Sequence, residues 1–485
     1  MPRLSSRTVV NSAKILQVRR LTNNNSWHLQ QRFRLFSIMG SKEGDIPDEH
    51  HVRRNGHLGK WLPEDHRVHK DWLGGVIDHV DNNKQELHPV LKEFKGLIEG
   101  DTRMYLLASS MFEQLPRKKP YNKDPTGHRQ VRDYQHMLQL LNHFLTTAPS
   151  WNDKSHRVGL VGLPINALLD WPMGTSSGFA FFLDPKVNAM LKKVLDAWGE
   201  YLQSPASAEV LGTDRGGWFG ETGAKDLTAT ANIGKTNHNF EDMFICDPSA
   251  KHHGFKSWDD FFTRLFREDI RPVAAPDNPD VIANACESMP YNVAHGVKAR
   301  DRLWIKGQPY SVIDMLAHDE LAEQFVGGTV YQAFLSALSY HRWHSPVSGK
   351  IVKAYVQDGT YYSEPPFEEF TESQAADEAG EATAQGYITA TATRAIIFIE
   401  AESSAIGLMA VIAVGMAEVS TCDITVKEGQ HVKKGDQIGM FHFGGSTHCL
   451  LFRKGVDVRG FPEPGRDHNV PVRGELGVVK SGSHS

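Results

Sequence analysis

Cysteine is scarce in this sequence, and no two cysteines lie near each other. Cys246, Cys286, Cys422 and Cys449 are the four cysteines in 485 residues, and no Cys-x-x-Cys pair occurs. This spacing matches neither a zinc site nor the disulfide framework of a small secreted domain. It indicates an intracellular protein without a metal centre.

Long apolar runs and clustered positive charges are also missing. The longest uncharged apolar stretch, residues 405–417, is too short to span a bilayer and is interrupted by Gly407 and Gly415. We therefore expect no transmembrane segment and interpret this stretch as buried β-structure. A net charge of −5 without a basic cluster argues against a nucleic-acid partner. With 40% apolar and 23% charged residues, the composition is typical of a soluble globular protein of two or three domains.

Acidic residues are absent from residues 1–42, which carry only basic charges. An Arg-rich, Ser-containing and acid-free composition is typical of a mitochondrial presequence, and residues 34–37 (Arg-Leu-Phe-Ser) resemble a presequence cleavage motif. The alternative is that translation starts at Met39. We expect residues 1–60 to be a presequence-like or flexible N-terminus, with a mitochondrial location if the presequence is real and a cytoplasmic one otherwise.

Helical periodicity dominates the next part of the chain. From residue 84 to residue 202, apolar side chains recur at spacings of three and four. The clearest predicted helix has Asp184 as its N-cap and Pro185 in its first turn. We predict an α-helical domain over residues 61–235. Within it, residues 212–234 are rich in Gly, Thr and Asp and are predicted to form a loop or linker.

Short predicted strands replace the helices further along the chain, after a helix capped by Ser257. The predicted strands are residues 281–285, 302–305, 350–355, 396–400, 408–414 and 423–426. Their spacing, with glycine turns between them, predicts a compact, mostly antiparallel β-domain, so the fold class is α+β. A strongly acidic insertion at residues 364–381 is predicted to be a solvated loop, with a substrate lid as the alternative.

A hydroxyl residue follows two glycines in Gly444-Gly445-Ser446-Thr447, between two apolar runs that are predicted strands. Glycine has no Cβ, so it tolerates strained backbone and leaves its carbonyl open to close approach. The Ser446 hydroxyl is therefore placed where it could attack the Gly445 carbonyl. Taken alone, these residues are also compatible with an ordinary Gly-Gly-Ser hairpin turn.

A second segment favours the interpretation that Ser446 is a reactive residue. This segment is Tyr-His-Arg-Trp-His-Ser-Pro at residues 340–346. With it the sequence resembles the phosphatidylserine decarboxylase family, including its soluble relatives, the pyruvoyl L-tryptophan decarboxylases. The resemblance runs from about Phe255 to Phe452. It includes residues 258–264, 271–272, 306–311 and 434–441. The resemblance implies a catalytic domain at residues 236–445, which becomes the β chain, and an α chain at residues 446–485.

The resemblance implies a proenzyme that cuts itself between Gly445 and Ser446. Ser446 Oγ would attack the Gly445 carbonyl, β-elimination would split the chain, and loss of ammonia would leave a pyruvoyl group made from Ser446. This cofactor would take the substrate amine as a Schiff base and hold the electron pair left when carbon dioxide departs. His344 is implied as the base for Ser446, and His341 as a proton donor or positioning group. Without the resemblance, a His-x-x-His pair is more often a helix surface or a satisfied core pair.

The acid that orients the base lies in a Pro-Ala-Asp-Gly segment of the family. The matching residues here are 285–288, so Glu287 stands where aspartate is usual. A buried glutamate with an ordinary structural partner is the alternative. Two further departures are Ser339, at a position where the family has aspartate, and residues 391–394, where the family has Asn-x-Arg. These departures indicate a divergent branch of the family.

The implied enzyme is a carboxy-lyase whose substrate is either phosphatidylserine or a free aromatic amino acid such as L-tryptophan. We prefer the free amino acid because of the helical domain and the missing membrane anchor. The expected partners are the small-molecule substrate and the protein's own α and β chains, and the family suggests a homodimer. Two other classes remain open. One is an unprocessed structural relative, and the other is a carrier module, since residues 426–436 resemble the β-hammerhead of biotinyl and lipoyl domains.

Overall fold

The computed structural model describes most of the chain after residue 65. The described ranges are 66–116, 130–151, 163–214, 216–234, 236–301, 310–363, 385–418, 421–443, 446–464, 466 and 468–480. All of them belong to one compact unit. The predicted presequence, the predicted strand at 302–305, the acidic insertion and the glycines Gly444 and Gly445 lie outside the described residues.

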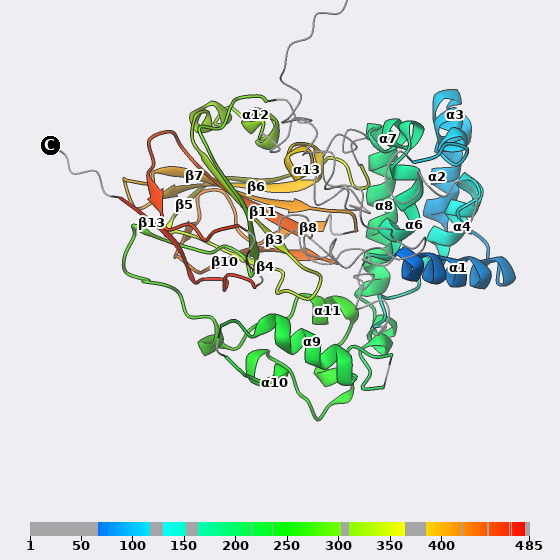
Figure 1. Cartoon of the computed structure of the whole chain (residues 1–485), viewed down its shortest axis with the longest axis horizontal. Helices are drawn as coiled ribbons and strands as arrows, with labels where there is room; N and C mark the ends of the chain where they lie inside the picture. Colours follow the sequence, from blue (N-terminus) through cyan, green and yellow to red (C-terminus); the bar gives the residue numbers. More distant parts are fainter. Residues whose placement is uncertain are drawn as a thin grey trace, which may run out of the picture. The chain divides into compact units, whose positions relative to one another are not determined.

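Helices form the N-terminal half of the described chain (Figure 1). They are α1 (His66–Asn82), α2 (Pro89–Gly100), α3 (Thr102–Ser110), α4 (Tyr134–Phe144), α6 (Pro164–Met173), α7 (Ser176–Phe182), α8 (Pro185–Leu202) and the short 3₁₀ turn η3 (Pro205–Val210). The prediction for α8 is confirmed, because the Asp184 side chain accepts a hydrogen bond of 2.9 Å from the Lys186 amide. The apolar stripe of α8 is buried from Val187 to Leu202.

A second group of helices connects this half to the strands. It comprises α9 (Glu221–Ala231), α10 (Phe240–Met243), η4 (Lys251–Gly254), α11 (Trp258–Phe262) and η5 (Glu268–Ile270). Ser257 caps α11 as predicted, with its Oγ accepting from the Asp260 amide at 3.1 Å. The loop prediction for residues 212–234 is wrong over α9. Its composition has low helix propensity, but Leu227 and Ala231 are buried, and this packing overrides propensity.

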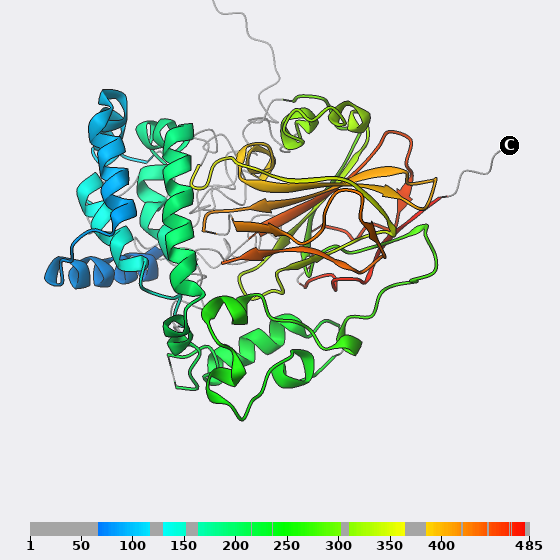
Figure 2. The same cartoon turned by 180° about the vertical axis from the view of Figure 1, so that it is seen from behind.

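One large sheet lies at the centre of the second half (Figures 1 and 2). Its strand order is β2-β3-β11-β7-β6-β5-β9, and every pair is antiparallel, as predicted. The strands are β2 (Met289–His295), β3 (Thr329–Leu335), β5 (Gly349–Gln357), β6 (Arg394–Ala401), β7 (Leu408–Gly415), β9 (His431–Val432) and β11 (Ser446–Phe452). All residues of β3, β7 and β11 are buried, so both faces of the central sheet are covered.

Two small antiparallel sheets lie beside the large one. One joins β1 (Val281–Ala283), β13 (Glu475–Val479) and β12 (Val458–Arg459), and the other joins β4 (Arg342–His344), β10 (Gln437–His442) and β8 (Thr421–Ile424). The remaining elements are α12 (Val312–Met315), η6 (Ala322–Phe325) and α13 (Gln385–Thr391). Strand β1 ends before the predicted residue 285. The register of β1 against β13 shifts between Ile282 and Ala283, which interrupts the regular ladder at this point.

The helical half contacts the sheet where β7 ends and β11 begins. Phe443, just before β11, packs against Trp198 of α8 with ring centroids 5.9 Å apart. Glu418, three residues after β7, accepts hydrogen bonds from the Ile165 and Asn166 amides at the start of α6. Two segments of the helical half therefore hold the residues around this end of the sheet.

Candidate active site

Ser446 is the first residue of β11 and lies between two neighbouring strands. It pairs with Leu335 of β3 on one side and with Gly415 of β7 on the other. The side chain is fully buried, and its Oγ has no hydrogen-bond partner among the described residues. Buried hydroxyls are normally bonded, so an unpaired one beside a Gly-Gly segment is a candidate reactive group.

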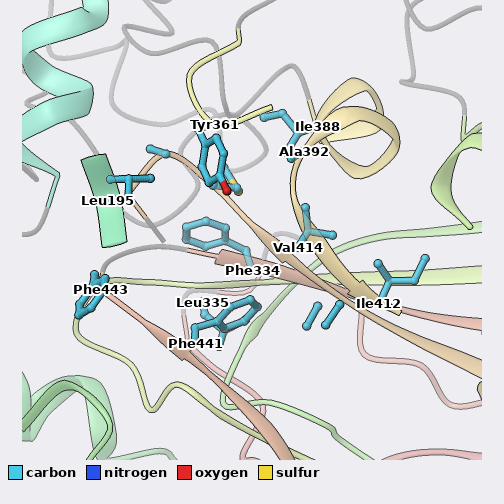
Figure 3. Packing of buried hydrophobic residues seen from close by; sticks show 14 of the residues in the cluster. Leu195, Phe334, Leu335, Tyr361, Ile388, Ala392, Ile412, Val414, Phe441 and Phe443 are labelled. Carbon is cyan, nitrogen blue, oxygen red and sulfur yellow. The ribbon is translucent and has the colours of Figure 1, made fainter. Parts of the chain in front are cut away.

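Apolar side chains surround the start of β11. Figure 3 shows five of them, Phe334, Leu335, Val414, Phe441 and Phe443. Leu335 pairs with Ser446 and shares its face of the sheet, whereas Phe334 and Val414 pair with Thr447 and lie on the opposite face. All five are buried. The Ser446 hydroxyl therefore lies among buried residues, where any polar interaction is stronger than it would be in bulk solvent.

Phe443 holds the chain on the approach to Ser446. Its backbone is in the left-handed region, with φ of 65°, which is a strained conformation for a residue with a large side chain. Trp198 contacts its ring, and Gly199 leaves the space for it, since a Cβ at Gly199 would lie 3.1 Å from Phe443 Cε2. The helical half thus stabilises a strained backbone one residue before the Gly-Gly pair.

His344, the predicted base, is buried in β4 and both of its ring nitrogens are engaged. Nδ1 lies 2.7 Å from the Gly435 carbonyl, and Nε2 lies 3.0 Å from the Tyr340 hydroxyl. The carbonyl can only accept, so Nδ1 carries the proton and Nε2 accepts from Tyr340. Burial, and then the charge of Arg473 at 3.2 Å from Nδ1, lower the pKa of His344 to about 3. The imidazole is therefore neutral at physiological pH.

Glu287, the predicted orienting acid, is buried but directed away from His344. Its oxygens accept from Arg271 Nε at 3.0 Å, from Arg271 Nη2, and from the Val472 amide at 2.8 Å. Glu287 and His344 both lie in the described part of the chain, and no hydrogen bond joins their side chains. The link is indirect, because Arg473, which follows Val472, has its Nε 3.2 Å from His344 Nδ1.

His341 is the second residue of the Tyr-His-Arg-Trp-His segment, three positions before His344, and it is fully buried. Its ring stacks on Phe262 of α11, with centroids 3.9 Å apart and an interplanar angle of 17°. Its carbonyl accepts from the Phe441 amide at 2.9 Å, which ties it to the strand that leads to Ser446. The Trp-Asp-Asp-Phe-Phe motif, residues 258–262, therefore supplies one wall of the site.

The two departures from the family pattern, Ser339 and residues 391–394, lie in segments whose side chains have hydrogen-bond partners. Ser339 Oγ lies 3.0 Å from Ser336 Oγ and accepts from Asn469 at 3.2 Å. Arg264, which is buried nearby, donates to the carbonyls of Leu338 and Ser339. Arg394 is also satisfied by carbonyl groups, those of Met315, Ala392 and Asp314.

Sequence reasoning missed three ionisable residues near Ser446. His442 Nδ1 lies 2.8 Å from Asp259 Oδ1. Burial disfavours a charged His442 ring, but the hydrogen bond to Asp259 and the negative charge of Asp259 outweigh burial and raise the pKa of His442. Burial raises the pKa of Glu418 to about 8, and its Oε2 has no partner in the described part of the chain. His448 is fully buried two residues after Ser446. Asp259 stands within the motif at residues 258–264, and His442 directly follows the motif at residues 434–441, so these positions were the available signal.

The segment that resembles a carrier hammerhead does not expose the lysine in its Lys-Gly-Asp turn. Lys434 is buried, and its Nζ donates to the carbonyls of Ala275, Asn278 and Val281 at 2.7, 2.7 and 2.9 Å. A carrier lysine must be free at a hairpin tip. The structure thus favours a structural role for Lys434.

None of the helices in the described ranges is both long and apolar enough to cross a membrane. Within the same ranges, no group of three or more His, Cys, Asp or Glu side chains is arranged to hold a metal ion.

Comparison with known proteins assigns the family. Two models described as phosphatidylserine decarboxylase match residues 88–227 and 258–473. Decarboxylase iboD of Amanita muscaria is 46% identical over 298 residues, covering 60% of this chain and 84% of that protein. L-Tryptophan decarboxylase of Psilocybe cubensis is 35% identical over 422 residues, covering 84% of this chain and 91% of that protein. The chain belongs to the phosphatidylserine decarboxylase family.

The similarity also extends to lipid-named members of the family. Phosphatidylserine decarboxylase proenzyme 3 of Schizosaccharomyces pombe is 32% identical over 218 residues, covering 45% of this chain and 21% of that protein. The match to this protein is therefore shorter than the match to the L-tryptophan decarboxylase.

Proposed function

We propose that this chain is a proenzyme that cuts itself before Ser446 and becomes a pyruvoyl-dependent carboxy-lyase. The observation that carries the proposal is the position of Ser446, whose buried and unpaired hydroxyl begins β11 directly after two glycines. Domain limits at residues 235 and 445, with residues 446–485 as the α chain, are part of the proposal.

The proposed self-cleavage has three steps, and the third consumes one water molecule. First, Ser446 Oγ bonds to the Gly445 carbonyl carbon as the Gly445–Ser446 amide bond breaks, and the hydroxyl proton moves to the Ser446 nitrogen. Then the Ser446 α-proton is removed and the Cβ–Oγ bond breaks, which releases Gly445 as a carboxylate. Hydrolysis of the remaining enamine releases ammonia and leaves the pyruvoyl group.

His344 is proposed as a base in this cleavage, and its neutral state is the form that can accept a proton. Its Tyr340 contact would have to open first, because that hydroxyl occupies the accepting Nε2. Glu287 is proposed to position the base through Val472 and Arg473 rather than by direct contact. His341 is proposed to position the substrate or donate a proton during decarboxylation.

The residues around Ser446 fit a pyruvoyl group in that position. That group supplies an electron sink for the pair left on the α-carbon when carbon dioxide departs. The chain's own contribution is the burial of Ser446 beside Leu335 of β3, which excludes water and so favours loss of a charged carboxylate as a neutral gas.

The proposed substrate is a free aromatic amino acid such as L-tryptophan. Its support is the similarity to L-tryptophan decarboxylase, which covers 84% of this chain. Phosphatidylserine is the second candidate, because phosphatidylserine decarboxylases match the catalytic part. Assays of the purified protein with L-tryptophan and with phosphatidylserine vesicles decide between them, and turnover of the vesicles alone would exclude the amino-acid proposal.

The first experiment compares the wild-type chain with Ser446→Ala by denaturing gel and intact mass. We expect the wild type to give a fragment ending at Gly445 and a fragment of residues 446–485 whose N-terminus has no free amine. The Ser446→Ala chain should stay whole. An intact wild-type chain would contradict the proposal and leave an unprocessed relative with a binding role.

A further inference from the structure

Thr447 is the first residue of β11 that keeps a backbone N–H after the proposed self-cleavage. Conversion of Ser446 into a pyruvoyl group removes its nitrogen as ammonia, so residue 446 loses the only backbone donor it could offer to a neighbouring strand. The cut also removes the covalent link to Gly445. Position 446 is then the free end of a strand, and chain ends that are not tied down become poorly ordered. The pyruvoyl carbonyl therefore keeps its position only if the next residue is held.

The Thr447 side chain makes two hydrogen bonds in addition to the backbone ladder. Its Oγ1 donates to the Ala333 carbonyl of β3 at 3.0 Å and accepts from Gln332 Nε2 of the same strand, also at 3.0 Å. Thr447 and Gln332 are both fully buried. Because an unpaired polar group is costly in such a place, these bonds hold Thr447 firmly against β3.

The side-chain amide of Gln332 is itself fixed by its neighbours. Its Oε1 accepts from the Tyr310 hydroxyl at 2.6 Å, and that hydroxyl accepts in turn from Asn292 Nδ2 at 3.2 Å. Its Nε2 donates to Gln385 Oε1 at 2.8 Å as well as to Thr447. The amide cannot turn without breaking these bonds. Thr447, Gln332, Gln385, Tyr310 and Asn292 therefore form one hydrogen-bonded group, the Thr447 network.

The Thr447 network also reaches the strand on the other side of Ser446. Gln385 of α13 has its Nε2 3.6 Å from Met416 Sδ. Met416 directly follows Gly415, the β7 residue that pairs with Ser446. Thr447 is thus connected to β3 directly and to the end of β7 through two glutamines. None of these side-chain contacts involves the peptide bond that is cut.

The Thr447 hydroxyl lies on the face of the sheet opposite to Ser446, because side chains alternate along a strand. It therefore acts through the backbone of β11, which it holds in register, and not by contact with the reacting atoms. In the uncut chain, residue 446 is also held by its bond to Gly445. The network should consequently matter more after cleavage than before it.

We infer that Thr447 and Gln332 are positioning residues that hold the new N-terminal end of the α chain after self-cleavage and keep its pyruvoyl carbonyl within reach of the substrate amine. The inference rests on the proposed function. It assigns a role in decarboxylation to a buried network that touches neither His344 nor the other residues proposed for cleavage.

The first test measures amide hydrogen exchange in residues 446–452 before and after cleavage. Thr447→Val keeps the branched shape of the side chain and loses the hydroxyl. We expect exchange at least about tenfold faster in the cut Thr447→Val protein than in the cut wild type. Between the uncut proteins Ser446→Ala and Ser446→Ala/Thr447→Val, the difference should stay below about threefold. Equal acceleration in the cut and uncut pairs would show a purely structural role and overturn the inference.

The second test compares cleavage and decarboxylation in the same preparations, with L-tryptophan or phosphatidylserine vesicles, whichever the wild type converts. Thr447→Val and Gln332→Met should cleave within about threefold of the wild-type rate by gel and intact mass. Their kcat should fall at least about tenfold with little change in KM, because a displaced carbonyl reacts less often while the substrate contacts remain. Thr447→Ser keeps the hydroxyl and should restore turnover.

Thr329→Val is the matched control. Thr329 is a buried threonine of β3 whose Oγ1 lies 3.0 Å from His295 Nδ1, and it pairs with Phe452 at the far end of β11. This variant should match the wild type in exchange, cleavage and turnover. Thermal unfolding checks each variant, and Gln332→Met decides if Thr447→Val does not fold.

Two results of the second test would overturn the inference. One is a wild-type kcat in the cut Thr447→Val protein, and the other is a cleavage rate that falls as much as kcat does. The exchange test needs no substrate, so it decides even if the wild type converts neither compound. Failure of the wild-type chain to cleave would instead count against the proposed function.

Discussion

The Phe443 ring lies against Gly199 of α8, so closely that a Cβ on this glycine would sit 3.1 Å from two ring atoms. The contact joins the helical half to the residue before the Gly-Gly pair. Under the proposed function the helical half contributes to self-cleavage, because α8 contacts the strained Phe443 three residues before Ser446.

Gly199→Leu is expected to slow self-cleavage. The added side chain must displace Phe443, and overpacking of this kind costs about 1–3 kcal/mol. The same substitution at Gly96 of α2 is the control, because a Cβ there meets nothing within 4 Å. Gel-based cleavage rates and thermal unfolding of both variants are the measurements. Equal cleavage rates would show that the position of Phe443 does not matter.

Glu287→Gln is expected to lower stability and cleavage rate together. Arg271 and Glu287 form a buried ion pair, with side-chain exposures of 8% and 1%. Removing one charge leaves the other uncompensated, which costs about 3–5 kcal/mol. Because Glu287 also accepts from the Val472 amide, its replacement should shift Val472 and the neighbouring Arg473, which lies beside His344.

Glu209→Gln provides the comparison, since Glu209 pairs with Lys251 on the exposed surface. This variant should match the wild type in chemical denaturation and in cleavage. A Glu287→Gln protein that cleaves at the normal rate would remove Glu287 from the catalytic machinery and leave it as a structural residue.

Glu418 should make the stability of the uncut chain fall as the pH rises. Its pKa is about 8 in the folded chain, against an ordinary value of 4.5, because burial disfavours the charge. The stabilisation is complete below pH 4.5 and is lost as the pH rises to about 8, since the unfolded chain gives up its proton first.

The substitution Glu418→Gln, made in the Ser446→Ala background, removes the loss of stability at high pH. It keeps an acceptor for the Ile165 and Asn166 amides. From pH 5 to pH 8 we expect it to gain on the order of 2–4 kcal/mol relative to its parent in urea unfolding. Parallel pH profiles for the two proteins would mean that Glu418 is already ionised in the folded state.

Local features of the fold could be predicted from the sequence because they depend on residues a few positions apart. The cap of α8 at Asp184, the cap of α11 at Ser257, and strands β5, β6 and β7 are of this kind. The residue types of the site were also visible, since Ser446, His341 and His344 stand in motifs that the family shares. Helix α9 was missed because its packing, and not its composition, stabilises it.

The positions of the site residues relative to one another depend on contacts between distant parts of the chain, so only the tertiary structure determined them. It placed Ser446 between Leu335 and Gly415, and it directed Glu287 to Arg271 instead of His344. It also put His448 on the face of Ser446, buried beside the ring of Tyr331. Strand order and the choice of buried partners follow from how the whole core excludes water, so residue spacing could not predict them.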